Sequence, residues 1–251
     1  MTATGEVREP AEEAVAPTPY PGVVVDWRIP ATPPGAAGGL ERFMGPGKTR
    51  AESLVELGGV GVCAALLALG VGATDLARGW SWAQLVVLAL VGLDLLGGIV
   101  TNATNSAKRW YHRQSPGARR ARLSFVAAHV LHLVVFGLVI LGGDPAWILG
   151  NTALLVIGAL LVEYAPLPVR RPVAMAVYAA AVLVGLFWLT VPAALAWFGP
   201  LFHLKLLVCH LVPEAPLAEA PRGGGDARGG GDARGGGDDR GGRDDRGGGD
   251  G

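Results

Sequence analysis

Apolar residues fall into six long runs between residues 53 and 212, separated by short polar connections. Each run has about 20 residues, the length that an α-helix needs to cross the hydrocarbon core of a bilayer. In hydrocarbon only helices and closed barrels satisfy their own backbone groups, so isolated runs of this kind predict helices. The predicted spans are residues 53–74, 82–103, 123–142, 146–164, 172–191 and 193–212.

The last run is the weakest predictor of a span. Pro192 and Pro200 interrupt it, and it also carries Lys205 and two histidines. A re-entrant or tilted amphipathic helix is the alternative, because proline lacks a backbone donor and charged side chains are rare in lipid. The sequence therefore predicts an all-α, polytopic transmembrane helix bundle with five or six spans.

The two ends of the chain have a different composition. Residues 1–50 mix proline, glycine and charged residues without a hydrophobic period, which predicts a disordered arm, with local docking of residues 23–27 as an open alternative. From Arg222 onward a Gly/Arg/Asp hexad repeats, with six arginines and seven aspartates. This repeat predicts a disordered tail over residues 217–251, and its balanced charge argues against nucleic-acid binding. The transmembrane domain is expected to occupy residues 51–216.

Basic residues alternate between the connections. Lysine and arginine are concentrated before the first run, between the second and third and between the fourth and fifth, whereas the opposite connections hold only Arg78. Because basic connections stay on the cytoplasmic side, the pattern predicts a cell-membrane protein with both termini in the cytoplasm. The lipid bilayer is the expected partner. A homo-oligomer is open, because Ala64, Ala68 and Gly72 form a ridge that allows close helix packing.

Ionisable side chains inside the runs are the candidates for function. At the centre of a bilayer they cost about 2.5 to 3.5 kcal/mol, so they normally face the bundle interior or a wet cavity. Asp94 lies in the middle of the second run. Thr101 and Asn105 continue its helical face toward the end of the run, and Asn102 lies next to Thr101 in the sequence. The sequence predicts a polar stripe that runs from Asp94 toward the cytoplasm.

Histidines of two other runs lie at a similar depth. His129 and His132 share one face of the third run, and His203 lies in the sixth. A rise of 1.5 Å per residue places Asp94, His132 and His203 roughly 13 Å, and His129 roughly 9 Å, from the cytoplasmic ends of their helices. The predicted intramembrane polar site consists of Asp94, Thr101, Asn102, Asn105, His129, His132 and His203.

Three interpretations of this site stay open. A polar site open to the cytoplasmic leaflet would serve transport or membrane assembly. A Zn or Fe site formed by Asp94, His129, His132 and His203 would make the protein an enzyme that acts on a lipid or isoprenoid. Interhelical hydrogen bonds alone would make it a structural or accessory subunit. The first two interpretations predict a small molecule of the lipid phase as partner, and no catalytic residue can be assigned.

Two segments resemble the characteristic segments of a family of small, uncharacterised bacterial integral membrane proteins. They are DLLGGIVTNATNSAKRWYHR at 94–113 and FHLKLLVCHLVPEAP at 202–216. The resemblance spans about residues 53–216 and implies a multi-pass helical fold in a bacterial membrane. It implies no activity and assigns no catalytic residue.

Overall fold

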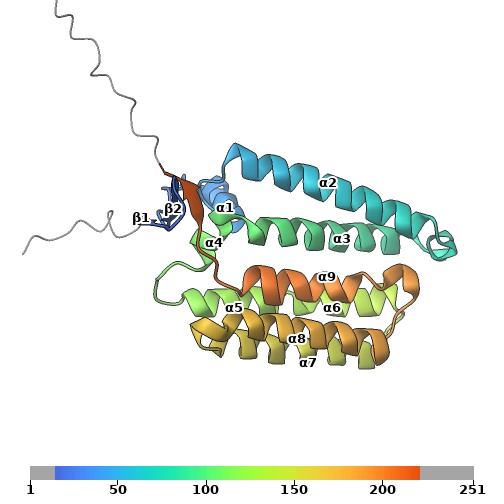
Figure 1. Cartoon of the computed structure of the whole chain (residues 1–251). Helices are drawn as coiled ribbons and strands as arrows, with labels where there is room; N and C mark the ends of the chain where they lie inside the picture. Colours follow the sequence, from blue (N-terminus) through green and yellow to red (C-terminus); the bar gives the residue numbers. More distant parts are fainter. Residues whose placement is uncertain (1–14, 221–251) are drawn as a thin grey trace, which may run out of the picture.

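The computed structural model describes residues 15–220, apart from the side chains of residues 76 and 77, and its helices lie side by side (Figure 1). Within these residues six helical spans are long and apolar enough to cross a membrane. They confirm the multi-pass helix bundle predicted from the sequence, including its sixth span. The spans are α2 (Arg50–Gly72), α3 (Trp82–Ala103), a third span (Ala118–Ile140), α7 (Pro145–Tyr164), α8 (Leu167–Phe187) and a sixth span (Ala193–His210).

The third and sixth spans are not uniform α-helices. The third consists of α5 (Ala118–Ala128), α6 (Val130–Val135) and the π-helical turn η2 (Phe136–Ile140). The sixth consists of the 3₁₀ turn η3 (Ala193–Leu195), α9 (Phe198–His203) and the π-helical segment η4 (Leu204–His210). Another 3₁₀ turn, η1 (Asp75–Gly79), joins α2 to α3.

Capping side chains fix where three of the spans begin. The Thr49 side chain accepts the N–H of Glu52 and the Glu52 side chain accepts the N–H of Thr49, so α2 starts with a capping box. Ser81 and Gln84 form the same reciprocal pair before α3, and Asp144 caps α7. The first turn of a helix has N–H groups without helical partners, and these caps satisfy some of them at the membrane boundary.

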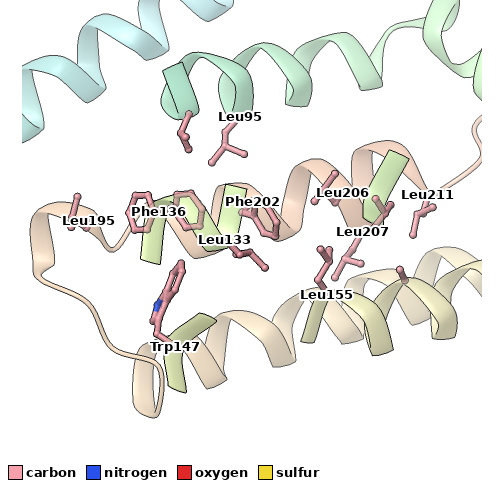
Figure 2. Close-up of a cluster of buried hydrophobic side chains, with 14 of the residues drawn as sticks. Leu95, Leu133, Phe136, Trp147, Leu155, Leu195, Phe202, Leu206, Leu207 and Leu211 are labelled. Atoms are coloured by element: carbon pink, nitrogen blue, oxygen red, sulfur yellow. The ribbon is translucent and has the colours of Figure 1, made fainter. Parts of the chain in front are cut away.

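The apolar core lies between α3, α6 with η2, α7 and α9 with η4 (Figure 2). Phe136 and Phe198 stack with ring centroids 3.9 Å apart, and the Trp147 ring lies 5.4 Å from that of Phe136. Fully buried leucines extend the core along the bundle: Leu95, Leu133, Leu155, Leu206, Leu207 and Leu211. Because lipid tails are as apolar as leucine, close packing rather than hydrophobic burial holds these helices together.

Helix α2 contributes little to this core, with Val71 as its buried member. Only 6% of the residues in its most apolar 18-residue stretch are buried, against 28% for α3 and 44% for the sixth span. It packs mainly on α3, and a cavity of about 380 Å³ lies between the two helices. Ala64, Ala68 and Gly72, whose small side chains predicted close packing, line this cavity. Within one chain, these small residues therefore border an open space beside α3 instead of packing tightly against that helix.

Both ends of the described chain lie at the same end of the bundle (Figure 1). There β1 (Val15–Pro17), β2 (Val23–Asp26) and β3 (Leu217–Glu219) form an antiparallel sheet in the order β1-β2-β3. Two short helices, α1 (Gly35–Met44) and α4 (Asn105–Tyr111), lie at this end as well. The connections that precede α2 and follow α3 are thus structured.

These elements differ from the disorder predicted for residues 1–50 and 217–251. The N–H of Asp26 donates to the carbonyl of Pro216 at 2.9 Å, and β2 finds its second partner only after the sixth span. Pairing between the two ends of a chain leaves no local hydrophobic period, so the sequence pattern could not reveal it. Residues 1–14 and 221–251, with the Gly/Arg/Asp repeat, lie outside the described residues.

A buried ion pair joins the third span to α7 at the same end. Glu163 has no solvent exposure, and its two carboxylate oxygens accept from the guanidinium of Arg122. Arg119 approaches the same carboxylate at 3.7 Å, and Arg170 donates to the Glu163 carbonyl. Removal of one partner from a buried pair leaves an uncompensated charge in a medium of low polarity.

We expect Glu163→Gln to lower the free energy of unfolding by about 3 to 5 kcal/mol, because Arg122 then keeps its charge without a counter-charge. Unfolding of the detergent-solubilised protein by increasing fractions of a denaturing detergent measures this loss. Asp75→Ala is the matched control, because the Asp75–Arg78 pair is almost fully exposed. Equal stability of the two variants would contradict the prediction.

Candidate functional site

Asp94 is the centre of the candidate site. It lies on α3 roughly 13 Å before the end of that helix, at 1.5 Å per residue. Three nitrogen atoms surround one carboxylate oxygen, Oδ2: Nζ of Lys205 at 2.5 Å, Nε2 of His132 at 3.0 Å and Nε2 of His129 at 3.9 Å. The third and sixth spans thus both contribute side chains to Asp94.

A local distortion of the third span brings its two histidines together. α5 ends at Ala128, the N–H of His129 bonds to the carbonyl of Val126, and the N–H of His132 bonds to the carbonyl of His129. Such i→i+3 bonds tighten the helix to about three residues per turn, so that side chains three apart eclipse each other. The two imidazole rings accordingly stack, with centroids 4.8 Å apart and planes at 13°.

The tautomer of His129 follows from its second contact. Its Nδ1 lies 2.7 Å from the carbonyl oxygen of Phe125. Because a carbonyl only accepts, Nδ1 carries the proton and Nε2 of the neutral ring has a free lone pair directed at Asp94. Nε2 of His132, at 3.0 Å, is close enough to donate to the carboxylate.

Lys205 belongs to the π-helical segment η4, and only 1% of its surface is exposed. Its side chain crosses α3 at Gly98, one turn after Asp94: a Cβ at Gly98 would lie 2.1 Å from Cε of Lys205. A side chain at position 98 would therefore force the end of the Lys205 side chain to shift. The close approach lets the lysine chain reach the carboxylate across the helix surface.

The structure corrects two members of the predicted site. His203 does not reach Asp94, because its Nδ1 donates to the carbonyl of Gly199 at 2.9 Å on another side of the span. Residues two apart project to nearly opposite sides of a helix, so Lys205 takes the position expected for His203. Asn105 also leaves the stripe, since α3 ends at Ala103 and the amide of Asn105 donates to the carbonyl of Leu217.

Lys205 is the residue that sequence reasoning missed. The sequence did contain a signal for Lys205, because a lysine inside an apolar run needs a charged partner or a water-filled cavity. Its position near the end of the run that was expected to face the cytoplasm favoured the interpretation that the side chain extends to the interface, as lysines near span ends do.

Asp94 faces a cavity of about 570 Å³ between α2, α3 and the arm. The predicted residues Thr101 and Asn102 line it together with Asp94, whose side chain is 38% exposed. At the end nearer the sheet, Glu56 accepts from Lys48 and from Thr101. Apolar side chains form the remaining wall: Phe43, Met44, Leu57, Val60 and Leu93. The cavity is therefore amphipathic, with charged groups at two levels.

Leu93 also lines the apolar cavity beside Ala64, so that the two spaces follow each other along the α2–α3 boundary. The larger one holds Asp94 and Glu56, whereas the smaller one has only apolar and glycine residues in its lining. Together they offer polar partners near the sheet end and an apolar channel further along.

The segment after α3 holds the end of the span that carries Lys205. The ammonium of Lys108 donates to the carbonyls of Cys209 and Val212, each at 2.7 Å, and burial lowers the pKa of Lys108. His112 bonds through Nε2 to the carbonyl of His210, and burial lowers the pKa of His112 to about 3. The His112 ring is therefore neutral near pH 7, so that its contact does not change with physiological pH.

Comparison of the chain with protein-family models, with curated proteins and with solved structures found no match. The resemblance of residues 94–113 and 202–216 to a bacterial membrane-protein family stays a prediction. The case for a function rests on the geometry around Asp94.

We expect Asp94→Asn to destabilise the protein more than Lys205→Met. Lys205 is 1% exposed, and Asp94 is its only acidic partner in the described part of the chain. Loss of that partner should lower the free energy of unfolding by about 3 to 5 kcal/mol. After Lys205→Met, Asp94 keeps the contact with His132 and its access to the cavity.

The double variant Asp94→Asn with Lys205→Met tests the coupling of the pair. It should be more stable than Asp94→Asn alone, because no unpaired charge is left at this point. Unfolding titrations of the three variants in mixed micelles give the coupling free energy. Strictly additive losses would show that the two side chains do not stabilise each other.

Proposed function

We propose that this protein of the cell membrane binds an amphiphilic molecule from the lipid phase between α2 and α3, in a role in transport or in membrane assembly. The observation that carries the proposal is the cavity of about 570 Å³ in which Asp94 and Lys205 meet an apolar wall at mid-membrane depth. Ligand cavities in proteins have volumes of about 300 to 1,000 Å³, a mostly apolar lining and a few polar groups that orient the ligand.

The two cavities suit the two parts of an amphiphile. The larger one contains the pairs Lys48–Glu56 and Lys205–Asp94, which can donate to and accept from a polar head. The smaller one, of about 380 Å³, is lined by apolar and glycine residues and can accept a hydrocarbon tail. A ligand with its head near Glu56 and its tail near Ala64 would lie parallel to the lipids around it.

The exposure of Asp94 favours binding over a purely structural role. Polar side chains that only fasten helices face each other and exclude other partners, whereas the Asp94 side chain keeps 38% of its surface open. Helix α2 covers both cavities, and only 6% of the residues in its most apolar stretch are buried. This loose packing also favours entry of a ligand from the bilayer. A loosely packed helix at this position can move aside at low cost.

The distribution of basic residues supports an orientation with both chain ends in the cytoplasm. Arg78 lies in η1, at the end of the bundle opposite the sheet. The other basic residues of the described chain, apart from Lys205, lie beside β2, in or near α1 and α4, and near the starts of α2, α5 and α8, all at the sheet end: Arg28, Arg42, Lys48, Arg50, Lys108, Arg109, Arg113, Arg119, Arg120, Arg122, Arg170 and Arg171. In this orientation the polar head would enter from the cytoplasmic leaflet.

Reporter fusions in a bacterial host test the orientation. We expect alkaline phosphatase to be active when fused after Gly143, in the connection before α7, and inactive when fused after Ala220, because the enzyme folds only outside the cytoplasm. Green fluorescent protein fused after Ala220 should be fluorescent. The reverse pattern would place the sheet end outside the cell and overturn the proposed orientation.

A substitution that fills the cavity tests the bound amphiphile. Gly97 lines the cavity, and a Cβ at this position would meet no atom within 4 Å. We expect Gly97→Leu to remove lipid-phase molecules that stay with the wild-type protein during purification in mild detergent, because the leucine occupies their space. Native mass spectrometry of the intact complexes measures this loss.

Gly61→Leu is the matched control. Gly61 also has open space, but it lies on α2 outside the residues that line either cavity. This variant should keep the copurified molecules. If wild-type protein carries no such molecule, or if both variants keep it equally, the proposal that the α2–α3 cavity binds an amphiphile is wrong.

A further inference from the structure

We propose that Asp94, His129 and His132 bind a divalent transition-metal ion of the zinc class, in competition with the ammonium group of Lys205. The donor atoms of the three residues all lie within 4.8 Å of one another. One carboxylate and two imidazoles form a donor set that binds zinc, and also non-haem iron. The inference is independent of the proposed amphiphile, since it concerns the wall of the cavity rather than its contents.

The separations of the donor atoms fit one ion. In a tetrahedral site with bonds of about 2.0 to 2.1 Å, neighbouring donors lie about 3.3 Å apart. Oδ2 of Asp94 lies 3.0 Å from Nε2 of His132 and 3.9 Å from Nε2 of His129, on either side of this value. The donor nitrogen atoms of the two imidazoles lie within 4.8 Å of each other, so the site closes when the two imidazoles tilt toward one ion.

The surroundings of His129 are those of a metal ligand. Metal-binding histidines usually donate their other ring N–H to a carbonyl or carboxylate, which fixes the tautomer and the direction of the lone pair. In His129 the bond from Nδ1 to the carbonyl of Phe125 has this role. The i→i+3 hydrogen bonds around His129 bring His132 to the same side of the helix. Helical hydrogen bonding alone would not require this distortion.

Without a metal ion, the ammonium group of Lys205 balances the negative charge of the Asp94 carboxylate. The ammonium contacts Oδ2, the oxygen that both histidines approach. Two cations at one oxygen repel strongly in a medium of low polarity, so the ion and the ammonium should alternate. Lys205 also lines the cavity, which gives its side chain space to turn away from Asp94.

An ion held by these three residues would keep coordination positions free. Structural zinc sites have four protein ligands, whereas sites with three protein ligands leave a position for water or substrate. Asp94 lines the cavity, so a free position can be directed into it. A metal there would act as a Lewis acid on the head of a bound amphiphile.

Cobalt and zinc binding to the purified full-length chain tests the site. We expect about one ion per chain and a visible Co²⁺ absorption spectrum typical of low-symmetry coordination, which Zn²⁺ abolishes by displacement. His129→Ala and His132→Ala should each weaken binding at least about 100-fold, since even the loss of an outer-shell partner weakens binding about 10- to 100-fold. Lys205→Met should strengthen binding roughly tenfold or more, because it removes the competing charge.

His203→Ala is the control, because His203 is equally buried in the bundle but does not contact Asp94. It should bind the ions like the wild-type protein. Circular dichroism and elution volume verify that each variant is folded, and any variant that is not folded is replaced by the corresponding glutamine substitution. The proposal is wrong if the folded wild-type chain binds no more ion than the variant that lacks both His129 and His132, or if His203→Ala loses binding to the same extent.

Gly97→Leu separates this inference from the proposed function. The substitution fills the cavity beside α2 but leaves Asp94 and the two histidines in place. Loss of copurified amphiphile with unchanged metal binding would show that the two sites fail or succeed independently.

Discussion

The structure depends on how a carboxylate is accommodated at mid-membrane depth. Asp94 lies in a helix whose other central residues are almost all apolar, and ionised it needs a counter-charge or a polar cavity. It has both, because Lys205 supplies the charge and the cavity beside α2 supplies the opening. Gly98 suits this arrangement, since a side chain there would displace the end of the lysine chain from its present path.

Two of the irregular parts of the helices lie next to the charged group Asp94. The third span changes from i→i+4 to i→i+3 bonding at His129, and the sixth becomes π-helical from Leu204, immediately before Lys205. Such departures from α-helical geometry are often found at functional sites, because they redirect side chains at a cost in backbone regularity. Here they direct side chains from two helices at one carboxylate oxygen. A bundle held only by apolar packing would have no need for them.

Depth along a helix could be predicted from the sequence, but direction around it and breaks between helices could not. The apolar runs predicted five or six spans, and a rise of 1.5 Å per residue brought Asp94, His129 and His132 to similar levels. The same calculation placed His203 at that level too, although the choice between it and Lys205 depends on how the sixth span is rotated. The break at Thr104, which removes Asn105 from the stripe, and the pairing of β2 with β3 depend on contacts between distant segments.

Helix α2 is held at both ends, and the part between them borders the two cavities. At the sheet end, the segment that leads into α2 is fixed: Tyr111 donates to the carbonyl of Phe43 in α1, and Gly45 packs so closely on Ala107 that a side chain there would clash. From Gly58 onward, none of the α2 glycines in the described chain has a neighbour within 4 Å of a would-be side chain. The far end is held as well, because Val71 is buried and η1 and η3 both pack on the helix. The part of α2 between its ends packs mainly on α3, so displacement of this part would open the apolar space. In the proposed function, an amphiphile would insert its tail beside Ala64 while its head stays near Glu56 at the sheet end, so that the head loses least of its solvation.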